Sequence, residues 1–135
     1  MNVAKTVLTA VLSATCGVAL AAKPIQNLID IPVPANIDGS SPSTEEVRSA
    51  IVAGCKERRW IPILDENNNI SCSILVRSKH FAEVDIPHTE DTFSIIYKDS
   101  RELDYNEKKQ RIHRNYNKWV LNLSDSIQRQ FGNSD

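Results

Sequence analysis

The sequence predicts a two-layer α+β fold, in which a four-stranded antiparallel meander is covered on one face by two helices. Apolar residues recur with the helical period in two segments, one after Ser43 and one near the C-terminus. Between these segments lie short runs of alternating apolar and polar residues, separated by turn residues. The predicted order is therefore helix, four strands, helix, within a single domain formed by residues 43–135.

The first helix is predicted to begin after Ser43, which has the capping-box spacing to Glu46, and to end near Arg58. Its apolar residues recur on one face, so that face should be buried. Gly54 lies on the same face and would allow another backbone to approach closely. The residues expected to be buried are Val47, Ala50, Ile51, Gly54 and Cys55.

Four short strands are predicted next, over residues 60–64, 70–77, 81–86 and 92–98. Pro62 cannot donate a hydrogen bond to a neighbouring strand, which places the first of them at a sheet edge. The Asn-rich residues 65–69 are typical of a turn, because asparagine tolerates left-handed backbone conformations. These features together predict an antiparallel meander.

The last helix is predicted to begin at a second capping box, formed by Asp104 and Glu107, and to end near Phe131. Gly132 follows and is a typical helix-ending residue. The apolar stripe of this helix occupies positions 112, 116, 119, 120, 123 and 127. Both helices should then cover the same apolar face of the sheet.

Residues 1–22 are predicted to form an export signal. Lys5 precedes a largely apolar run that is short and rich in Ala, Thr and Ser, unlike a membrane-spanning helix. The run contains Ala19-Leu20-Ala21, which has the small-x-small pattern of a cleavage site. Lipidation at Cys16 is the alternative, although the preceding residues match a lipobox poorly. The protein is thus expected to be periplasmic or secreted, with no transmembrane segment after cleavage.

Composition narrows the possible partners. The whole chain carries a formal net charge of −1, which argues against a general binder of nucleic acid. Export disfavours nucleic acid and ATP as well, and the sequence contains no glycine-rich phosphate loop. No cofactor is predicted.

Residues 23–42 are predicted to form an extended arm, because they contain several prolines and apolar residues without a helical period. The first half of the arm should pack on the domain, and a disordered leader is the alternative. One place for the arm to dock is the face of the sheet that the helices leave open.

Cleavage would leave Cys55 and Cys72, which the predicted helix and strand turn towards the same core. Two cysteines in an oxidising compartment favour a disulfide. Two buried free thiols are the alternative, because helix–sheet packing often holds Cα atoms more than about 7 Å apart.

Several segments from residue 43 onward carry a resemblance to a known family. They are Arg59-Trp60, the stretch RSKH at 77–80, FSIIYKDS at 93–100 and IHRNYNKWV at 112–120. In these segments the chain resembles a family of small bacterial lipoproteins and periplasmic proteins with no assigned activity. The resemblance implies an α-ββββ-α domain in the cell envelope and implies no mechanism. Members often carry a lipidated cysteine, and the poor lipobox at Cys16 departs from that pattern.

The open face of the sheet is the leading candidate for a partner surface. Alternation along the strands predicts a mixture of apolar and charged side chains there, which is typical either of a docking site for the arm or of an interface. Such an interface could hold an envelope protein, a ligand or a second copy of the chain. Leu75, Phe81 and Ile96 would be anchors, and Arg77 and Lys98 would select for charge. The full candidate surface is Ile61, Ile63, Leu75, Arg77, Phe81, Ile96 and Lys98.

Two other function classes have weaker support. Asp99, Ser100 and His113 are the residue types of a hydrolase triad, but Ser100 lacks the Gly-x-Ser-x-Gly context of a nucleophile. A metal-dependent site shared by His80 and His113 is a further alternative, but these histidines lack the short spacing of metal ligands. The leading hypothesis is therefore a non-enzymatic interaction domain without a metal site.

A third hypothesis concerns a basic ridge at the start of the last predicted helix. Its members are Arg111, Arg114 and Lys118, spaced three and four residues apart. The ridge is either a solvated helix face or a contact for anionic lipids or acidic glycans.

Overall fold

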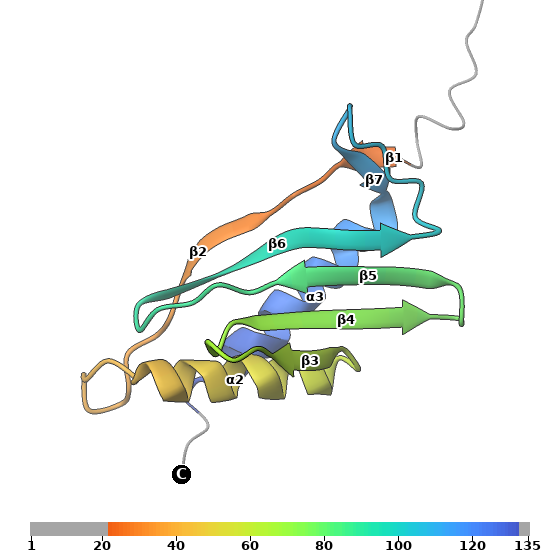
Figure 1. Cartoon of the computed structure of the whole chain (residues 1–135). Helices are drawn as coiled ribbons and strands as arrows, with labels where there is room; N and C mark the ends of the chain where they lie inside the picture. The colour runs from red at the N-terminus through yellow and green to blue at the C-terminus, as the bar shows by residue number, and fades with distance from the viewer. Residues whose placement is uncertain (1–21, 133–135) are drawn as a thin grey trace, which may run out of the picture.

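The computed structural model describes residues 22–132, which form two helices and seven strands arranged in two antiparallel sheets (Figure 1). The main sheet has the strand order β2-β6-β5-β4-β3. Its strands are β2 (Leu28–Pro32), β3 (Ile61–Leu64), β4 (Ile70–Val76), β5 (His80–Asp85) and β6 (Thr92–Arg101). The second sheet pairs β1 (Ala22–Pro24) with β7 (Arg111–His113), and the helices are α2 (Thr44–Glu57) and α3 (Arg114–Gln130).

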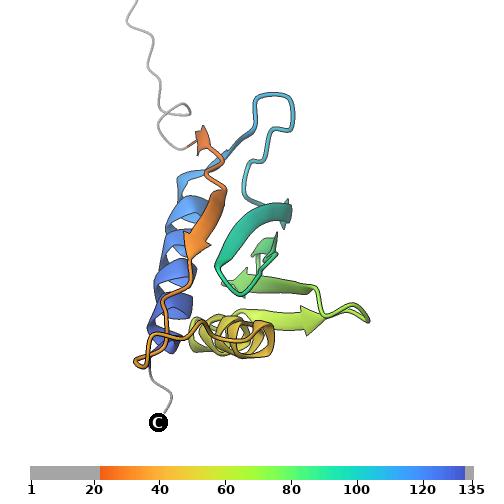
Figure 2. The ribbon, with the colours of Figure 1, turned by 90° about the vertical axis from the view of Figure 1, so that its left-hand side faces the viewer.

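The main sheet is curved, and its inner face is turned towards both helices (Figure 2). One continuous core lies between the sheet and the helices. It includes Ile51 from α2, Val84 and Ile95 from the sheet, and Tyr116 and Leu123 from α3, all with no exposed surface. The α+β class is thus confirmed.

Helix α2 is the element that the sequence predicts most closely. Ser43 is its N-cap, and the Ser43 hydroxyl accepts a 3.1 Å hydrogen bond from the backbone N–H of Glu46. The predicted buried set is confirmed in full. A Cβ atom on Gly54 would lie only 2.6 Å from the Cα of Ile127, so the absence of a side chain allows α2 and α3 to cross closely.

Strands β3 to β6 form the predicted meander, and β3 lies at the sheet edge as Pro62 requires. The disulfide between Cys55 and Cys72 is confirmed, with the two Cα atoms 6.6 Å apart. It joins the last turn of α2 to the middle of β4 across 17 residues. The helix and the sheet are therefore linked covalently through the core.

The prediction of a single four-stranded sheet is wrong, because the N-terminal arm supplies further strands. β2 lies antiparallel to β6, with Leu28 opposite Ile95 and Ile31 opposite Phe93. An irregularity between these pairs, where Asp30 has a φ of 53°, lets the proline-rich segment join the ladder. The arm therefore extends the edge of the sheet, and the expectation that it docks on the open face is wrong.

The predicted start of the last helix is also wrong. Asp104 has a φ of 53° and lies outside any helix, and α3 begins ten residues later at Arg114. Residues 111–113 instead form β7, because β1 offers them a ladder partner. The N-cap is His113, whose Nδ1 accepts a hydrogen bond from the backbone N–H of Asn115. The predicted apolar stripe nevertheless faces the core from Tyr116 onward.

The predicted signal segment, including Cys16, lies outside the described residues except for Ala22, which begins β1. Within residues 22–132, neither helix combines the length and the apolar composition needed to cross a membrane.

Candidate interaction surface

The open face of the main sheet carries three rows of side chains that run across the strands. The strand register gives the rows directly, because directly opposed residues in an antiparallel ladder point to the same face. The rows are Leu75 with Phe81 and Arg101; Ile61 with Ser73, Glu83 and Asp99; and Ile63 with Ser71, Asp85 and Ile96. We call this set the open face.

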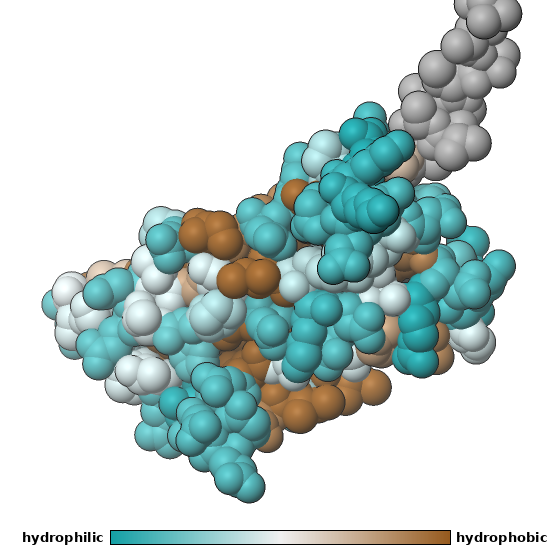
Figure 3. Space-filling model, turned by 45° about the horizontal axis from the view of Figure 1, so that its top comes forward, coloured by the Kyte–Doolittle hydropathy of each residue, from teal (hydrophilic) through white to brown (hydrophobic). Residues whose placement is uncertain are grey.

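Aliphatic side chains on the open face are exposed to solvent. Ile61, Ile63 and Leu75 have exposed fractions of 63%, 52% and 59%. β2 joins the far edge of the sheet, so this strand does not cover them. Figure 3 views the molecule obliquely from above and shows apolar surface as separate patches among hydrophilic residues. The predicted mixture of apolar and polar surface is therefore present.

Two of the predicted anchors are less accessible than Leu75. Phe81 is half-buried, and the guanidinium of Arg101 lies 4.3 Å from its ring centroid in a cation–π contact. Ile96 is half-buried as well. The exposed apolar area therefore lies mainly on β3 and β4.

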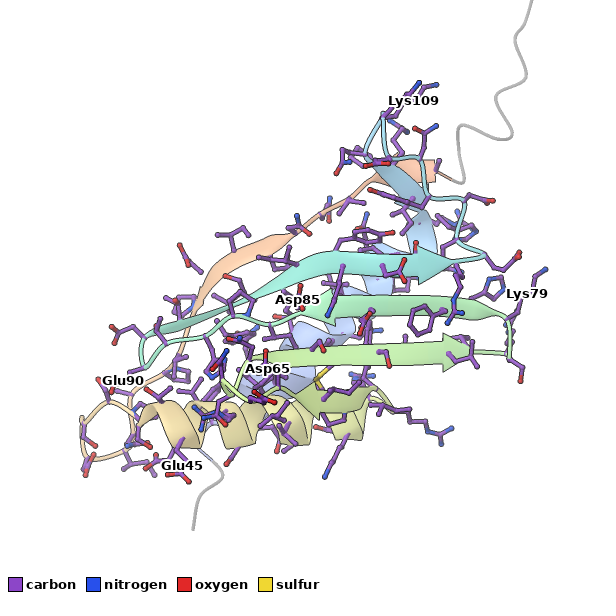
Figure 4. All side chains as sticks on the ribbon, in the orientation of Figure 1. Glu45, Asp65, Lys79, Asp85, Glu90 and Lys109 are labelled. Atoms are coloured by element: carbon purple, nitrogen blue, oxygen red, sulfur yellow. A yellow bond between two sulfur atoms is a disulfide. The ribbon has the colours of Figure 1, made fainter. Side chains whose placement is uncertain are left out.

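Charge is distributed unevenly along the open face. Lys98 lies 3.6 Å from Asp85 and 4.0 Å from Glu83, so one ammonium faces two carboxylates. Asp65, at the β3–β4 turn, lies at the same end of the sheet as Asp85 (Figure 4). Hydrogen bonds from Asn69 lower the pKa of Asp65, and Lys98 adds a smaller contribution in the same direction. This end of the open face is therefore predominantly acidic.

The opposite end of the open face is predominantly basic. Lys79, at the β4–β5 turn, lies at that end (Figure 4). Lys79 lines a pocket together with Leu75, Ser78, Phe81, Arg101 and one carboxylate, Glu102. Leu75 therefore lies in the row that contains Arg101, whereas Ile63 lies in the row that contains Asp85.

Arg77 does not belong to the open face, which corrects its predicted place. Alternation along β4 would point it outward, but Arg77 has a φ of 57° and lies in the turn after the strand. It lines a cavity of about 290 Å³ at the end of the sheet. The cavity also contains His80 and His113, so the structure brings together the two histidines that the sequence separates. No local pattern in the sequence groups the other residues that line this cavity, which are Val76, Leu103, Asn115 and Trp119.

The three residues of the hypothetical triad are held by other contacts. Asp99 lies opposite Glu83 on the open face, whereas Ser100 lies opposite the buried Ala82. The Ser100 hydroxyl is 2.8 Å from the hydroxyl of Tyr97, whose pKa is raised by burial. His113 caps α3. Asp99 and Ser100 therefore point to opposite faces of the sheet, and Nδ1 of His113 is occupied at the start of α3.

The basic ridge is not a single helix face, because α3 starts later than predicted. Arg111 lies in β7, and its guanidinium donates a 2.9 Å hydrogen bond to the carbonyl of Ala22. Arg114 is the first residue of α3, and Lys118 lies one turn further along. Arg111 thus links β7 to β1 and stabilises their pairing.

Within residues 22–132, no group of three or more His, Cys, Asp or Glu side chains is arranged to hold a metal ion. Comparison with family models, with curated proteins and with solved structures finds no match to this chain. The resemblance to small bacterial envelope proteins stays a prediction.

Proposed function

We propose that this protein is an exported, non-enzymatic interaction domain of the bacterial cell envelope, and that the open face is its interaction surface. The observation that carries the proposal is the exposure of Ile61, Ile63 and Leu75 on a sheet face left open by both helices and by β2. Solvent-exposed aliphatic side chains grouped on one sheet face are typical of an interface.

Two features support export. The Cys55–Cys72 disulfide fits an oxidising compartment, because structural disulfides are rare where thiols are kept reduced. Ala22 lies opposite His113 in the β1–β7 ladder, so a mature chain that begins at Ala22 would keep this pair.

The partner that the open face fits best is a second copy of the chain. Its acidic end holds Asp65 and Asp85, and its basic end holds Lys79 and Arg101. Two copies related by a two-fold axis, with their strands running in opposite directions, would place the acidic end of one against the basic end of the other. The aliphatic residues would be buried between the sheets, as in a face-to-face sheet packing.

The test is the oligomeric state of the mature chain, measured by sedimentation equilibrium over a range of concentrations. We expect a concentration-dependent dimer that Leu75→Asp weakens by at least about tenfold, because the substitution buries a charge in the interface. The matched control is Leu121→Asp on α3, where the leucine is 49% exposed and lies away from the open face. This control should dimerise normally.

A monomer at every concentration, or a dimer that Leu75→Asp leaves unchanged, would contradict the proposed self-association. A monomer that a photo-crosslinker at position 75 joins to another envelope protein would assign the open face to a different partner. Circular dichroism of both variants checks that the fold is retained.

A further inference from the structure

Three basic side chains with hydrogen-bonding nitrogen atoms line the cavity of about 290 Å³ between the β4–β5 turn and the start of α3. They are Arg77, His80 and His113, and the residues that line the cavity include no carboxylate. Arg77 has no ion-pair partner among the described residues. The first turn of α3 also contains no acidic residue, so the helix dipole adds to the positive potential. The cavity therefore favours negative charge.

The two histidines are held there by the backbone of one loop. The ring Nδ1–H of His80 donates a 2.7 Å hydrogen bond to the carbonyl of Glu102. The next carbonyl, that of Leu103, accepts a 2.8 Å hydrogen bond from the backbone N–H of His113. Two successive carbonyls after β6 thus fix both residues, and their proximity is built into the fold.

The same hydrogen bonds determine which ring nitrogen carries the proton. A carbonyl can only accept, so Nδ1 of His80 is protonated and the neutral ring has its lone pair on Nε2. In His113, Nδ1 accepts from the backbone N–H of Asn115, so the proton of the neutral ring is on Nε2. A metal ion would need a lone pair at Nε2 of His113, where this ring carries its proton. The pair therefore offers one donor and one acceptor, which suits a partly protonated anion.

We propose that this cavity binds the phosphate group of a phosphate monoester. The guanidinium of Arg77 would pair with two phosphate oxygens, and Nε2–H of His113 would donate to a third. The hydroxyl of a phosphate monoanion would donate to Nε2 of His80; with a second pKa of about 6, about half of a phosphate monoester is in this form at about pH 6 and about a tenth at about pH 7. Trp119 would contact the organic part of the ligand. The phosphate could belong to a free small molecule or to a lipid headgroup, which present the same chemistry.

The experiment titrates the protein with methyl phosphate and follows the imidazole resonances of His80 and His113 by NMR. We expect saturable shifts of both rings with a dissociation constant below about 10 mM. Arg77→Gln should weaken binding by about tenfold or more, because it removes a bidentate charge-assisted contact. His113→Asn should weaken it too, while asparagine can still cap α3 and preserve the fold.

Two controls separate this site from general surface charge. Arg114→Gln removes a neighbouring charge that does not line the cavity, and it should leave the affinity within about twofold. Methyl sulfate has a similar shape but no hydroxyl for His80, so it should bind several-fold more weakly than methyl phosphate. Equal affinity for the two anions, absence of saturable shifts, or loss of binding with Arg114→Gln alone would overturn the proposal.

A parallel experiment distinguishes the two sources of phosphate. Flotation with phosphatidylcholine vesicles that contain phosphatidate tests a headgroup, and methyl phosphate tests a free ligand. Vesicle binding that depends on Arg77 would assign the site to a lipid, and methyl phosphate binding without vesicle binding would assign it to a small molecule. Leu75→Asp should leave either result unchanged, so the proposal for the cavity and the proposal for the open face can be contradicted independently.

Discussion

The two faces of the main sheet share the same strands but differ sharply in what covers them. On the inner face, Cys72 and Val84 have no exposed surface, and both helices pack over them. On the open face, Leu75 from the same strand as Cys72 is 59% exposed. Alternation along a strand therefore assigns a side chain to a face, whereas the fold decides whether that face supplies stability or remains available for contact.

The test with the largest expected effect on stability replaces one phenylalanine on each face. Phe93 is fully buried, with its ring 6.4 Å from that of Phe131, and Phe93→Ala should lower the free energy of unfolding by about 4 kcal/mol. Phe81 is half-buried beneath Arg101, and Phe81→Ala should cost about 1 kcal/mol. Urea unfolding of the two variants measures both values. Similar losses of unfolding free energy in the two variants would mean that the two faces contribute equally to stability.

A second test concerns the helix crossing that covers the inner face. Gly54→Ala would place a methyl group 2.6 Å from the Cα of Ile127, a backbone atom that cannot move without shifting α3. We expect a loss of about 2 kcal/mol, despite the higher helix propensity of alanine. Ser49→Ala, at an exposed position of α2, is the control and should change stability by less than about 0.5 kcal/mol. A stabilised Gly54→Ala variant would show that the crossing is loose.

The test with the smallest expected effect concerns a polar contact beside the same crossing, between Glu57 and Ser126, which we call the rim contact. The Ser126 hydroxyl lies 2.8 Å from a Glu57 carboxylate oxygen, and this contact, followed by Arg129, lowers the pKa of Glu57. A lowered pKa means that ionised Glu57 stabilises the fold above the pKa of the unfolded chain, and the effect is lost as pH falls through the folded value. Glu57→Gln should therefore reduce the loss of stability on acidification below about pH 5.

Urea unfolding at several pH values measures this effect. Glu66→Gln, in the exposed β3–β4 turn, is the control and should retain the acid dependence of the parent chain. An unchanged acid dependence in Glu57→Gln would exclude the rim contact as a contributor to stability.

The elements that could be predicted from sequence are those defined by local patterns. α2 has its cap and its apolar stripe within one segment, and each strand of the β3–β6 meander is bounded by its own turn residues. β1, β2 and β7 could not be found in this way, because each exists only through a partner far away in the sequence. The false capping box at Asp104 shows the same limit, since the pairing of β7 with β1 overrides a local helix signal.

The candidate sites follow the same division. Alternation within strands is a local property, so it places Ile61, Ile63, Leu75, Phe81 and Ile96 on the open face and fails for Arg77. It does not find Asp99 and Arg101, because the β5–β6 register shifts between Tyr97 and Asp99 and the strand continues past the predicted end at residue 98. The place of Arg77 depends on a left-handed turn without glycine, which nothing in the local sequence marks clearly. The cavity joins a hairpin turn, a loop and a helix start, so it emerges only from the tertiary fold.

The distant pairing of the N-terminal strands also bears on the order in which the protein folds. The backbone N–H of Gln26 bonds to the side chain of Asn117 across 91 residues, and that of Asp30 bonds to Ser94 across 64. Closing such loops costs more chain entropy than closing the hairpins of the meander. We therefore expect β1 and β2 to join last. Until they do, the edge of β6 that β2 will occupy has no partner strand, and the newly made chain is then most prone to aggregate.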